Sequence, residues 1–493
     1  MAETTRRAQT PTERIRERAP RVVVIGDLLL DGWWSGTIGR IAREAPAPVV
    51  DLNAREHVPG GAANTAVNLA ALGARVAAVG LVGDDEAGRI LREALADAGV
   101  DVSRVRAIAG ARTTTKVRVS AGEQVIVRID DSEPDPWPAP ALDALIDDVA
   151  TASADADAQV VCDYGSLLGD EIVERLAALP RPALRVVDAH DARRLRALRP
   201  ELVTPNAAEA ELLAGESLGS GEQRAERAAE LSERIREAAG ARAAVVTLDR
   251  DGTVLLAPGA TPVRTRAHPY PEKQASGAGD VFVAALTAAH ASGEPLESAV
   301  ALAQRAADVA VQRVGTCVCG LDELERAAGA ELAVVDQDLL AARLDEHRAR
   351  GDRIVFTNGC FDVLHRGHTA SLRQAASLGD VLVVAVNSDA SVRRLKGEER
   401  PVNGERDRAD VIAALACVDY VTIFTEDTPR ELIRRLRPHV YAKGGDYTPE
   451  MLAETAAADE IGAEIAILDY VADHSTTQII GRIREVASDG ARR

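Results

Sequence analysis

The sequence predicts two α/β domains in series, each a largely parallel sheet covered by helices, with a charged helical linker between them. Short apolar runs that suit buried parallel strands alternate with helical stretches over residues 21–314 and again over 353–486. Between these series, residues 321–351 have the pattern of charged helix. At roughly 150 residues per domain, a chain of 493 residues has room for both domains.

The first domain is expected over residues 21–328, after a disordered N-terminal tail at residues 1–20. Its strands are expected at residues 21–26, 76–82, 160–162, 184–188, 202–204 and 244–248, and its helices at 62–72, 86–98, 225–239, 276–291 and 296–314. Residues 116–129 form two alternating stretches around a turn that contains Gly, which predicts a β-hairpin set apart from the main sheet.

A helical linker is expected at residues 329–350 and the second domain at 351–493. The strands of this domain are expected at residues 353–357, 381–386, 421–424, 440–443 and 465–468, and its helices at 368–378, 408–416, 429–436 and 476–486. This order predicts a Rossmann-like, doubly wound sheet, in which ligands bind beyond the carboxyl ends of the strands.

Composition excludes several classes of function. The chain has 58 Lys and Arg against 77 Asp and Glu, a net charge of −19, so we expect neither nucleic acid nor an anionic membrane as a partner. No run of apolar residues is long enough to span a bilayer, and residues 1–20 lack the apolar core of a secretory signal. Five scattered cysteines argue against a disulfide framework and for a reducing, cytoplasmic location.

A cluster of histidines marks the second domain. Residues 357–368 read TNGCFDVLHRGH and connect an expected strand to a helix. His365 and His368 share a helix face, where imidazoles and backbone amides together can bind a phosphate. Lys396 and Lys443, two of only four lysines, each precede a Gly and suit a phosphate clamp. The alternative is a pair of surface histidines at a helix cap.

These motifs resemble a known family. TNGCFDVLHRGH, RLKG, KGGDY and STT, in that order, are similar to the cytidylyltransferase-like nucleotidyltransferases over residues 350–488, and VAVNSDASVRRLKGEERPVN looks closest to the heptose-1-phosphate adenylyltransferases. The resemblance implies that His365, His368, Lys396 and Lys443 are catalytic and stabilise the triphosphate, with Mg²⁺ bound mainly to the nucleotide. It also implies ATP contacts from Thr357, Asn358, Gly359, Phe361, Asp362, Arg408, Ser475, Thr476 and Thr477.

The first domain carries a glycine-rich helix start. Residues 276–280 read SGAGD before a long apolar helix. The amides of Gly277, Ala278 and Gly279 can form an anion hole, and Asp280 beside it suits a general base that accepts a hydroxyl proton. The alternative is a glycine-rich cap with an acidic residue in the first turn.

Together with VPGGAAN at residues 58–64 and Asn206-x-x-Glu209, this motif resembles the ribokinase-like, PfkB-type sugar kinases over residues 21–320. The resemblance implies Asp280 as the catalytic base, and Asn206 and Glu209 as residues that position ATP and Mg²⁺. It implies that the sugar is held by Asp27, Gly60, Gly61 and Asn64. The hairpin would be a lid, which in this family often pairs with a second subunit, so we expect a homodimer.

Further stretches narrow the substrate. RIAREAPAPVV, TTTKVRV and VIVRID are similar to the heptose-7-phosphate kinases, which makes Lys116 and Arg128 candidate contacts to the sugar phosphate. Two positions depart from the pattern: Gln274 stands where the family usually has Asp, and His190 stands where the heptose kinases have Lys. The first departure leaves activation by a monovalent cation such as K⁺ in doubt.

Both halves in this order resemble the bifunctional heptose-7-phosphate kinase and heptose-1-phosphate adenylyltransferase family. The expected reactions are phosphorylation of heptose 7-phosphate at O1 and adenylyl transfer to heptose 1-phosphate, with a separate phosphatase acting between them. Two alternatives stay open. The same chemistries could act on another sugar phosphate or use CTP or GTP, or an inactive kinase half could serve as a dimerisation module for an active transferase.

Overall fold

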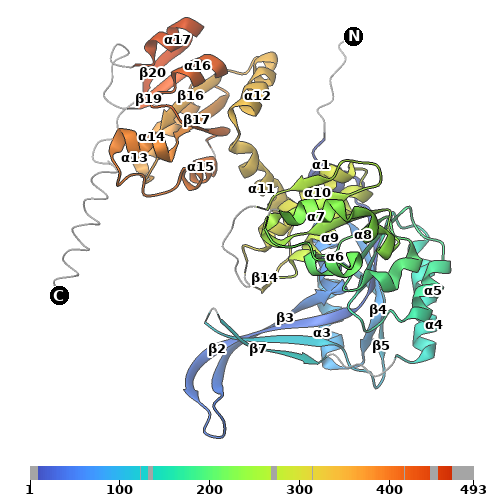
Figure 1. The fold of residues 1–493 in the computed structure, drawn as a ribbon. Helices are drawn as coiled ribbons and strands as arrows, with labels where there is room; N and C mark the ends of the chain where they lie inside the picture. The colour runs from blue at the N-terminus through green and yellow to red at the C-terminus, as the bar shows by residue number, and fades with distance from the viewer. Residues whose placement is uncertain are drawn as a thin grey trace. The chain divides into compact units, whose positions relative to one another are not determined.

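The computed structural model describes residues 9–122, 124–131, 137–221, 223–267, 275–313, 315–415, 417–444 and 453–468. The chain divides into two compact units, Met1–Glu325 and Arg326–Arg493, which are treated separately below (Figure 1). Among the described residues, no helix is long and apolar enough to cross a membrane.

A nine-stranded sheet forms the centre of the first unit. Its strands, in spatial order, are β13 (Val263–Thr265), β12 (Thr253–Leu256), β11 (Ala243–Thr247), β10 (Leu202–Val203), β9 (Leu184–Ala189), β8 (Ala158–Asp163), β1 (Arg21–Gly26), β4 (Arg75–Gly83) and β5 (Asp101–Ile108). All neighbours are parallel except β11–β12 and β12–β13. The chain runs outward from β1 on one side through β4 and on the other through β8, so the gap between β1 and β8 is the topological switch point, where α/β sheets bind ligands.

Helices cover both faces of this sheet. They are α2 (Ala62–Ala71), α3 (Glu86–Asp97), α4 (Ala139–Ser153), α5 (Asp170–Ala178), α6 (Ala207–Ala214), α7 (Gln223–Glu230), α8 (Ser232–Ala239), α9 (Ala278–Ala291) and α10 (Leu296–Ala310), with 3₁₀ turns at η1 (Ala192–Leu198) and η2 (Asp249–Asp251). One core cluster joins alternate residues of the central strands to α4, α5, η1, α6 and α8. The helices α2 and α9, which are buried along most of their length, pack against each other and against the central strands.

A second sheet of four strands projects from this unit, and we call it the lid (Figure 1). Its order is β3 (Pro48–Gly61), β2 (Leu28–Ile41), β6 (Thr115–Ala121) and β7 (Gln124–Asp131). The predicted hairpin at residues 116–129 is confirmed as β6 and β7. The long β2–β3 pair was not expected, because its glycines and prolines interrupt the alternating pattern. They suit close strand contacts: a Cβ atom on Gly36 would lie 2.4 Å from the carbonyl oxygen of Asp51.

The N-terminal segment differs from the expected disordered tail. Residues 11–18 form helix α1 (Pro11–Arg18), which begins with a capping box between Thr10 and Glu13. The side chain of Ile15 is fully buried, and Arg14 pairs with Glu294 at 2.7 Å. One buried apolar residue and a buried ion-pair partner are enough to hold this short helix, so the prediction is wrong for residues 11–18.

The second unit is built on a five-stranded parallel sheet. Its order is β18 (Tyr420–Phe424), β17 (Val381–Asn387), β16 (Ile354–Gly359), β19 (Val440–Gly444) and β20 (Glu464–Leu468). Its helices are α12 (Gln337–Arg350), α13 (Arg366–Ala376), α14 (Asp389–Lys396), α15 (Glu405–Ala413), α16 (Arg430–Leu436) and α17 (Thr455–Ile461). The strand order reverses between β16 and β19. The helix expected at residues 476–486 lies outside the described residues.

The linker is shorter than expected. Helix α11 (Leu321–Ala333) spans the division between the units, but α12 packs within the second unit. Leu340 and Leu344 of α12 are fully buried in a core cluster with Ile354 and Phe356 of β16. The expected linker at residues 329–350 is therefore wrong for α12, whose apolar side chains belong to the domain that follows.

In the first unit, the two short strands β14 (Ala275–Ser276) and β15 (Gly315–Thr316) pair beside the start of α9.

Candidate active sites

The first candidate site lies at the N-terminus of α9. Gly277 is the N-cap with φ of +83°, and the first intrahelical bond runs from the Val281 amide to the Gly277 carbonyl. The amides of residues 278–280 thus lie outside the helical pattern and point forward from the helix. A Cβ atom on Gly279 would meet nothing within 4 Å. Amides facing open space at a positive helix end are the arrangement that an anion hole requires.

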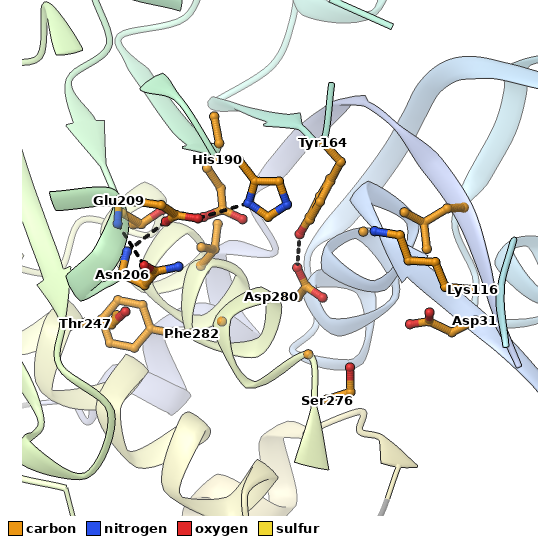
Figure 2. A pocket seen from close by; sticks show the side chains of 18 of the residues that line it. Asp31, Lys116, Tyr164, His190, Asn206, Glu209, Thr247, Ser276, Asp280 and Phe282 are labelled. Atoms are coloured by element: carbon orange, nitrogen blue, oxygen red, sulfur yellow. Dashed lines mark hydrogen bonds and ion pairs between the residues drawn. The ribbon is translucent and has the colours of Figure 1, made fainter. Parts of the chain in front are cut away.

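Asp280 is held at this helix end by two donors, and Figure 2 shows one of them, Tyr164. Its side chain is buried, the Asn64 Nδ2 atom donates to Oδ2 at 2.8 Å, and the Tyr164 hydroxyl donates to Oδ1 at 2.8 Å. Burial raises the pKa of Asp280 to about 6, although both hydrogen bonds oppose the shift. A buried carboxylate that is ionised at neutral pH, beside an anion hole, suits a general base.

Other elements complete a pocket around Asp280, which we call the kinase pocket. Its lining residues come from the lid, from the ends of β8, β9 and β11, and from the first turns of α6 and α9. They are Leu29, Asp31, Gly61, Lys116, Arg118, Tyr164, Asp188, Ala189, His190, Thr204, Asn206, Glu209, Thr247, Ser276, Gly277, Gly279, Asp280, Phe282 and Val283. The structure therefore brings the predicted base, two anion-hole glycines, Gly61, Lys116, Asn206 and Glu209 to one cavity.

Asn206 and Glu209 are tied to each other at the start of α6. The Asn206 amide donates to Glu209 Oε2 at 2.9 Å, and the Glu209 amide donates to Asn206 Oδ1 at 3.0 Å, which is a capping box. Glu209 Oε1 lies 3.0 Å from His190 Nδ1, and this hydrogen bond is the main cause that raises the pKa of His190. Glu209 lines the kinase pocket, and each of its oxygens can accept a second hydrogen bond.

The predicted sugar-binding residues separate into two groups. Asn64 contacts Asp280, and Gly61 lines the kinase pocket. Asp27 does not line it, because its carboxylate accepts from the Tyr164 amide at 2.6 Å and from the Ser166 hydroxyl at 2.5 Å. Asp27 therefore fixes the loop after β8 at the switch point.

Asp31 takes the place expected of Asp27 in the kinase pocket. It is buried and lines the cavity. Gly60 does not line the cavity, but a Cβ atom there would lie 2.7 Å from Asp31 Oδ2, so its glycine makes room for this carboxylate. Asp31 lies in β2 and is the second acid in GDLLLD, four residues after Asp27, so the sequence alone does not distinguish the two acids.

The lid supplies a different arginine from the one predicted. Lys116 lines the kinase pocket, but Arg128 pairs with Asp130 at 2.9 Å and is not among the lining residues. Arg118, opposite Arg128 in the β6–β7 register, lines the pocket instead. Its guanidinium donates to Asp31 at 3.1 Å and to Ser276 at 3.0 Å. Lys116 and Arg118 are two residues apart in β6, so both side chains lie on the same face of the strand. The two-residue period of a strand could have indicated this from the sequence.

The second candidate site spans the switch point between β16 and β19. Asn358, at the carboxyl end of β16, accepts through Oδ1 from Lys443 Nζ at 2.9 Å and from the Tyr441 hydroxyl at 3.0 Å. Burial lowers the pKa of Lys443, while Glu454 opposes the shift. A Cβ atom on Gly444 would lie 3.2 Å from Ser371 Oγ, so the end of β19 contacts α13.

The two predicted histidines lie together at the start of α13. Their rings stack with centroids 3.8 Å apart, and Phe361 meets His368 edge-on at 5.4 Å. Burial, and then the neighbouring His365, lowers the pKa of His368 to about 4. His368 is therefore neutral at pH 7 in the protein without ligands.

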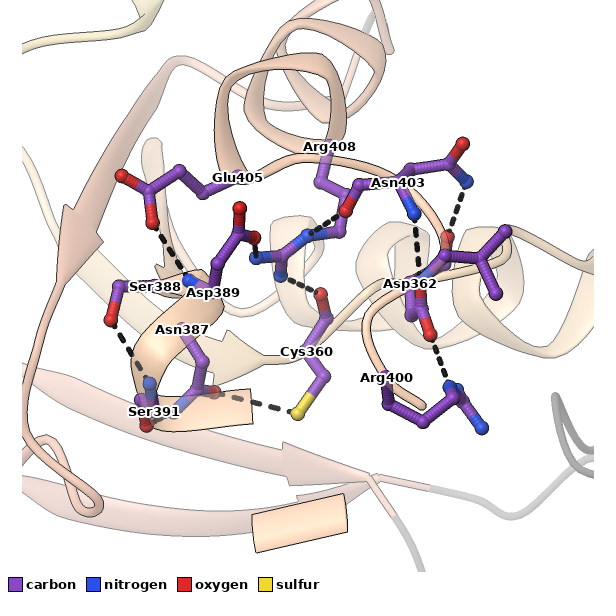
Figure 3. A network of polar contacts seen from close by, with 11 residues as sticks. Cys360, Asp362, Asn387, Ser388, Asp389, Ser391, Arg400, Asn403, Glu405 and Arg408 are labelled. Atoms are coloured by element: carbon purple, nitrogen blue, oxygen red, sulfur yellow. Dashed lines mark hydrogen bonds and ion pairs between the residues drawn. The ribbon is translucent and has the colours of Figure 1, made fainter. Parts of the chain in front are cut away.

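Asp362 and Arg408, predicted as ATP contacts, belong to a network of protein contacts (Figure 3). Asp362 is buried, pairs with Arg400 and accepts from the Val402 amide at 2.6 Å. Arg408 is also buried, and its guanidinium donates to the carbonyls of Cys360 and Asn403 and, at 2.8 Å, to Asp389. Both residues hold the loops around the site together.

The remaining predicted residues are spread around the same edge. Thr357 is buried in β16, and a Cβ atom on Gly359 would lie 3.0 Å from the Phe361 ring. Lys396 is exposed at the end of α14, and its charge acts to lower the pKa of Cys360, which burial raises. Ser475, Thr476 and Thr477 lie outside the described residues, as does Gln274.

Comparison with known proteins agrees with the two predicted domains. Residues 20–324 match the pfkB family of carbohydrate kinases, and residues 356–482 match the cytidylyltransferase-like family. The bifunctional protein HldE of Pelobacter propionicus is 40% identical over 479 residues, covering 95% of this chain and 97% of the relative. HldE of Pseudomonas aeruginosa is 40% identical over 476 residues, covering 95% and 98%. Phosphofructokinase-2 of Escherichia coli shares the fold of the first unit, with a TM-score of 0.52 and 21% identity over 62% of this chain and 98% of that chain.

The fold and the two sites thus define a carbohydrate kinase of the PfkB type joined to a cytidylyltransferase-like nucleotidyltransferase. The chain belongs to the family of bifunctional HldE proteins, the heptose kinase and adenylyltransferase family that its motifs resemble. The predicted fold class and the prediction of a bifunctional enzyme are confirmed.

Proposed function

We propose that the first unit phosphorylates O1 of heptose 7-phosphate in the kinase pocket. Asp280 accepts the O1 proton, the oxygen forms a bond to the γ-phosphorus of ATP, and the bond from that phosphorus to the β–γ bridging oxygen breaks, so that ADP leaves. The amides of residues 277–279 stabilise the charge on the transferring phosphoryl. The single observation that supports this most is Asp280, buried and doubly hydrogen-bonded, at the open end of α9.

We further propose that ATP enters the kinase pocket together with Mg²⁺. No group of three or more His, Cys, Asp or Glu in the described part of the chain could hold a metal ion alone. Mg²⁺ commonly binds one or two carboxylates together with substrate phosphates, and Glu209 has lone pairs free for this on the nucleotide side. Asn206 and Glu209 would hold the ion, which would neutralise phosphate charge. Gln274 supports no assignment of a monovalent cation.

The second unit would transfer AMP from ATP to heptose 1-phosphate. A phosphate oxygen of the sugar bonds to the α-phosphorus, the α–β bridging bond breaks, and pyrophosphate leaves. Lys443, held by Asn358, and the stacked imidazoles of His365 and His368 would bind the triphosphate, with Lys396 at the rim. No covalent enzyme intermediate is required, because positioning and charge stabilisation suffice.

The direct test uses the full chain with D-glycero-D-manno-heptose 7-phosphate, ATP and Mg²⁺, and detects heptose bisphosphate by mass spectrometry. Asp280→Asn should abolish this product and leave ADP-heptose formation from heptose 1-phosphate intact. Bisphosphate formation by the Asp280→Asn variant at the wild-type rate would contradict the proposal.

A panel of sugar phosphates and nucleotides separates the alternatives. Each activity is measured with ATP, CTP and GTP and with hexose and heptose phosphates. A transferase that prefers CTP or GTP would replace the adenylyl assignment. ATP binding without turnover of any sugar phosphate in the first unit would favour the inactive kinase half, for which His190 in place of Lys is the motivation.

The proposed reactions also imply a partner enzyme. The phosphate at position 7 of the heptose bisphosphate must be removed between the two steps, so a separate bisphosphate phosphatase is required.

Exposed apolar residues on the lid support a homodimer through that sheet: Ile38, Ile41, Leu52, Val127 and Ile129. Five cysteines without disulfides support a cytoplasmic location.

A further inference from the structure

Tyr164 occupies a central place in the kinase pocket that the sequence motifs did not single out. It follows β8 at the switch point, and its hydroxyl donates to Asp280 Oδ1 at 2.8 Å. Asn64 donates to the other oxygen at the same distance. The carboxylate is therefore gripped from both sides, and each oxygen keeps a lone pair for a substrate hydroxyl.

Hydrogen bonds to Asp27 fix the backbone around Tyr164. Asp27 Oδ2 accepts from the Tyr164 amide at 2.6 Å and from the Ser166 amide at 3.3 Å, while Oδ1 accepts from the Ser166 hydroxyl. Asp27 is itself buried directly after β1. Three hydrogen bonds to one buried carboxylate restrict the backbone of this turn. The Tyr164 side chain therefore starts from a fixed position beside Asp280.

The ring of Tyr164 is also confined from two directions (Figure 2). The Lys116 ammonium of the lid lies 5.4 Å from the ring centroid, within cation–π range. The His190 ring meets it edge-on with centroids 5.1 Å apart. Lys116 stands on the proposed sugar side and His190 on the proposed nucleotide side, so Tyr164 lies between the two substrates.

We propose that Tyr164 is a positioning residue of the kinase reaction, which aims the Asp280 carboxylate at the substrate hydroxyl and keeps it ionised. This inference rests on the proposed role of Asp280 as general base. A phenol donates a stronger hydrogen bond to an ionised carboxylate than to the neutral acid, so its hydrogen bond favours the form that can accept a proton. Fixed direction matters equally, because proton transfer requires the base within hydrogen-bond reach of the hydroxyl.

Several titratable groups face Asp280 and enter the pH dependence. They are Asp31 on β2, Lys116 on β6, Cys162 on β8, Tyr164 after β8 and Asp188 on β9. Tyr164 differs from the others because it donates a hydrogen bond to the carboxylate, and desolvation raises its own pKa well above the usual value. It therefore stays a neutral donor throughout the pH range of an assay.

The test is Tyr164→Phe in the full chain, which keeps the ring and removes the donor. We expect the kinase kcat to fall about 10- to 100-fold, the KM values for ATP and heptose 7-phosphate to change less than about threefold, and the acid limb of the kcat/KM profile to move to higher pH, since the ionised carboxylate has lost a donor. Thermal unfolding of the first unit, compared with that of the wild-type chain, reports that this unit is folded. Tyr420→Phe, at the start of β18 in the second unit, is the control for the loss of a phenol hydroxyl.

A second substitution should shift the acid limb in the opposite direction. It keeps the phenol hydroxyl, so the test does not depend on whether the protein folds with Phe at position 164. Incorporation of 2,3-difluorotyrosine at position 164 keeps the shape and strengthens the donor, so the acid limb should move to lower pH. An unchanged kcat and pH profile in both variants, or a change in KM alone, would overturn the inference. If Asp280→Asn keeps kinase activity, the proposed base itself fails, which is a separate outcome from an inert Tyr164.

Discussion

A Cβ atom on Gly277 would lie 2.4 Å from Nδ2 of Asn64, the same atom that donates to Asp280. Gly277 also has φ of +83°, a backbone conformation that L side chains rarely adopt. The glycine thus forms part of the proposed anion hole and, at the same time, leaves room for a donor to Asp280, the proposed base.

Gly277→Ala should therefore damage the kinase selectively. The left-handed conformation costs about 1–2 kcal/mol for Ala, and the new methyl group displaces Asn64 from Asp280. We expect kinase kcat/KM to fall about 100-fold and adenylyl transfer to stay within about twofold. Kinetic assays of both activities, with thermal unfolding of the same samples, measure this.

Two other glycines, Gly279 and Gly169, provide comparisons. Gly279→Ala adds a methyl group that meets no protein atom within 4 Å, so it should keep wild-type stability and hinder only the phosphoryl group. Gly169→Ala, at the start of α5 and also without a neighbour within 4 Å, should change neither stability nor activity. Equal kinase loss in Gly277→Ala and Gly169→Ala would contradict the specific role of Gly277.

In the first unit the sequence predicted β1, β4, β8, β9, β10, β11 and the glycine-rich start of α9, because these depend on local patterns. Apolar runs such as RVVVIG and the glycine series before an apolar helix keep their meaning without knowledge of the fold. Asp31 and Tyr164 could not be placed in the same way. Asp27 and Asp31 look alike in the sequence, and only the packing of the loop after β8 on Asp27 shows which acid is left to face the cavity.

The second unit shows the same division. The pair His365 and His368 was identified from its spacing, its position between a strand and a helix, and the resemblance of its motif, and the structure stacks the two rings. The burial of Arg408 could not be predicted from the sequence, because an arginine on a helix gives no sign that its guanidinium is buried among carbonyl groups. Its burial depends on tertiary contacts with residues far away along the chain.

The kinase should lose activity in acid as Asp280 takes up its proton. The pKa of Asp280 is raised to about 6 by burial, so the base is ionised above that pH and neutral below it. We expect kcat/KM to fall with decreasing pH through about 6. Asp188, whose pKa is raised to about 7 by burial, titrates in the same pocket, and so the limb is an apparent value. Rate profiles from pH 5 to 9, at saturating Mg²⁺, measure it.

Asp188→Asn separates the two carboxyl groups. If Asp280 is the base, this variant should keep an acid limb, moved to lower pH because a neighbouring negative charge is gone. Disappearance of the limb in Asp188→Asn would transfer the role of base to Asp188.

Arg408→Met tests whether this arginine binds ATP or supports the fold. Met keeps the stem but removes the donors to two carbonyls and to Asp389, which leaves buried acceptors without partners. We expect the unfolding free energy of the second unit to fall by about 3 kcal/mol, with adenylyl transfer lost in parallel and kinase activity preserved. Arg393→Met, exposed on α14, is the control. A raised KM for ATP at unchanged stability would instead restore the predicted ATP contact.

The lid should carry the subunit contact. Ile129 is 49% exposed and Val127 46% exposed on β7, and both are apolar. A carboxylate at such a position would be buried without a partner in a dimer, so Ile129→Asp should yield monomers. Light scattering after gel filtration measures the mass. Val411→Asp, equally exposed on α15 of the second unit, should remain dimeric. A monomeric wild-type chain would exclude the lid dimer altogether.

His368 should titrate far below an ordinary histidine. Its pKa is lowered to about 4, first by burial and then by His365, so in the free protein it takes up a proton only well below pH 6.5. The unfolded chain binds that proton earlier, and the second unit should therefore lose stability as pH falls from 6.5 to 4, by on the order of 3 kcal/mol. His368→Gln should remove this part of the pH dependence, and His365→Gln should raise the pKa of His368. Denaturant unfolding at several pH values and NMR titration of the imidazole carbons measure the two effects. A wild-type His368 that titrates near 6.5 would show that the ring is hydrated rather than buried against Phe361, and that it meets the triphosphate as a cation.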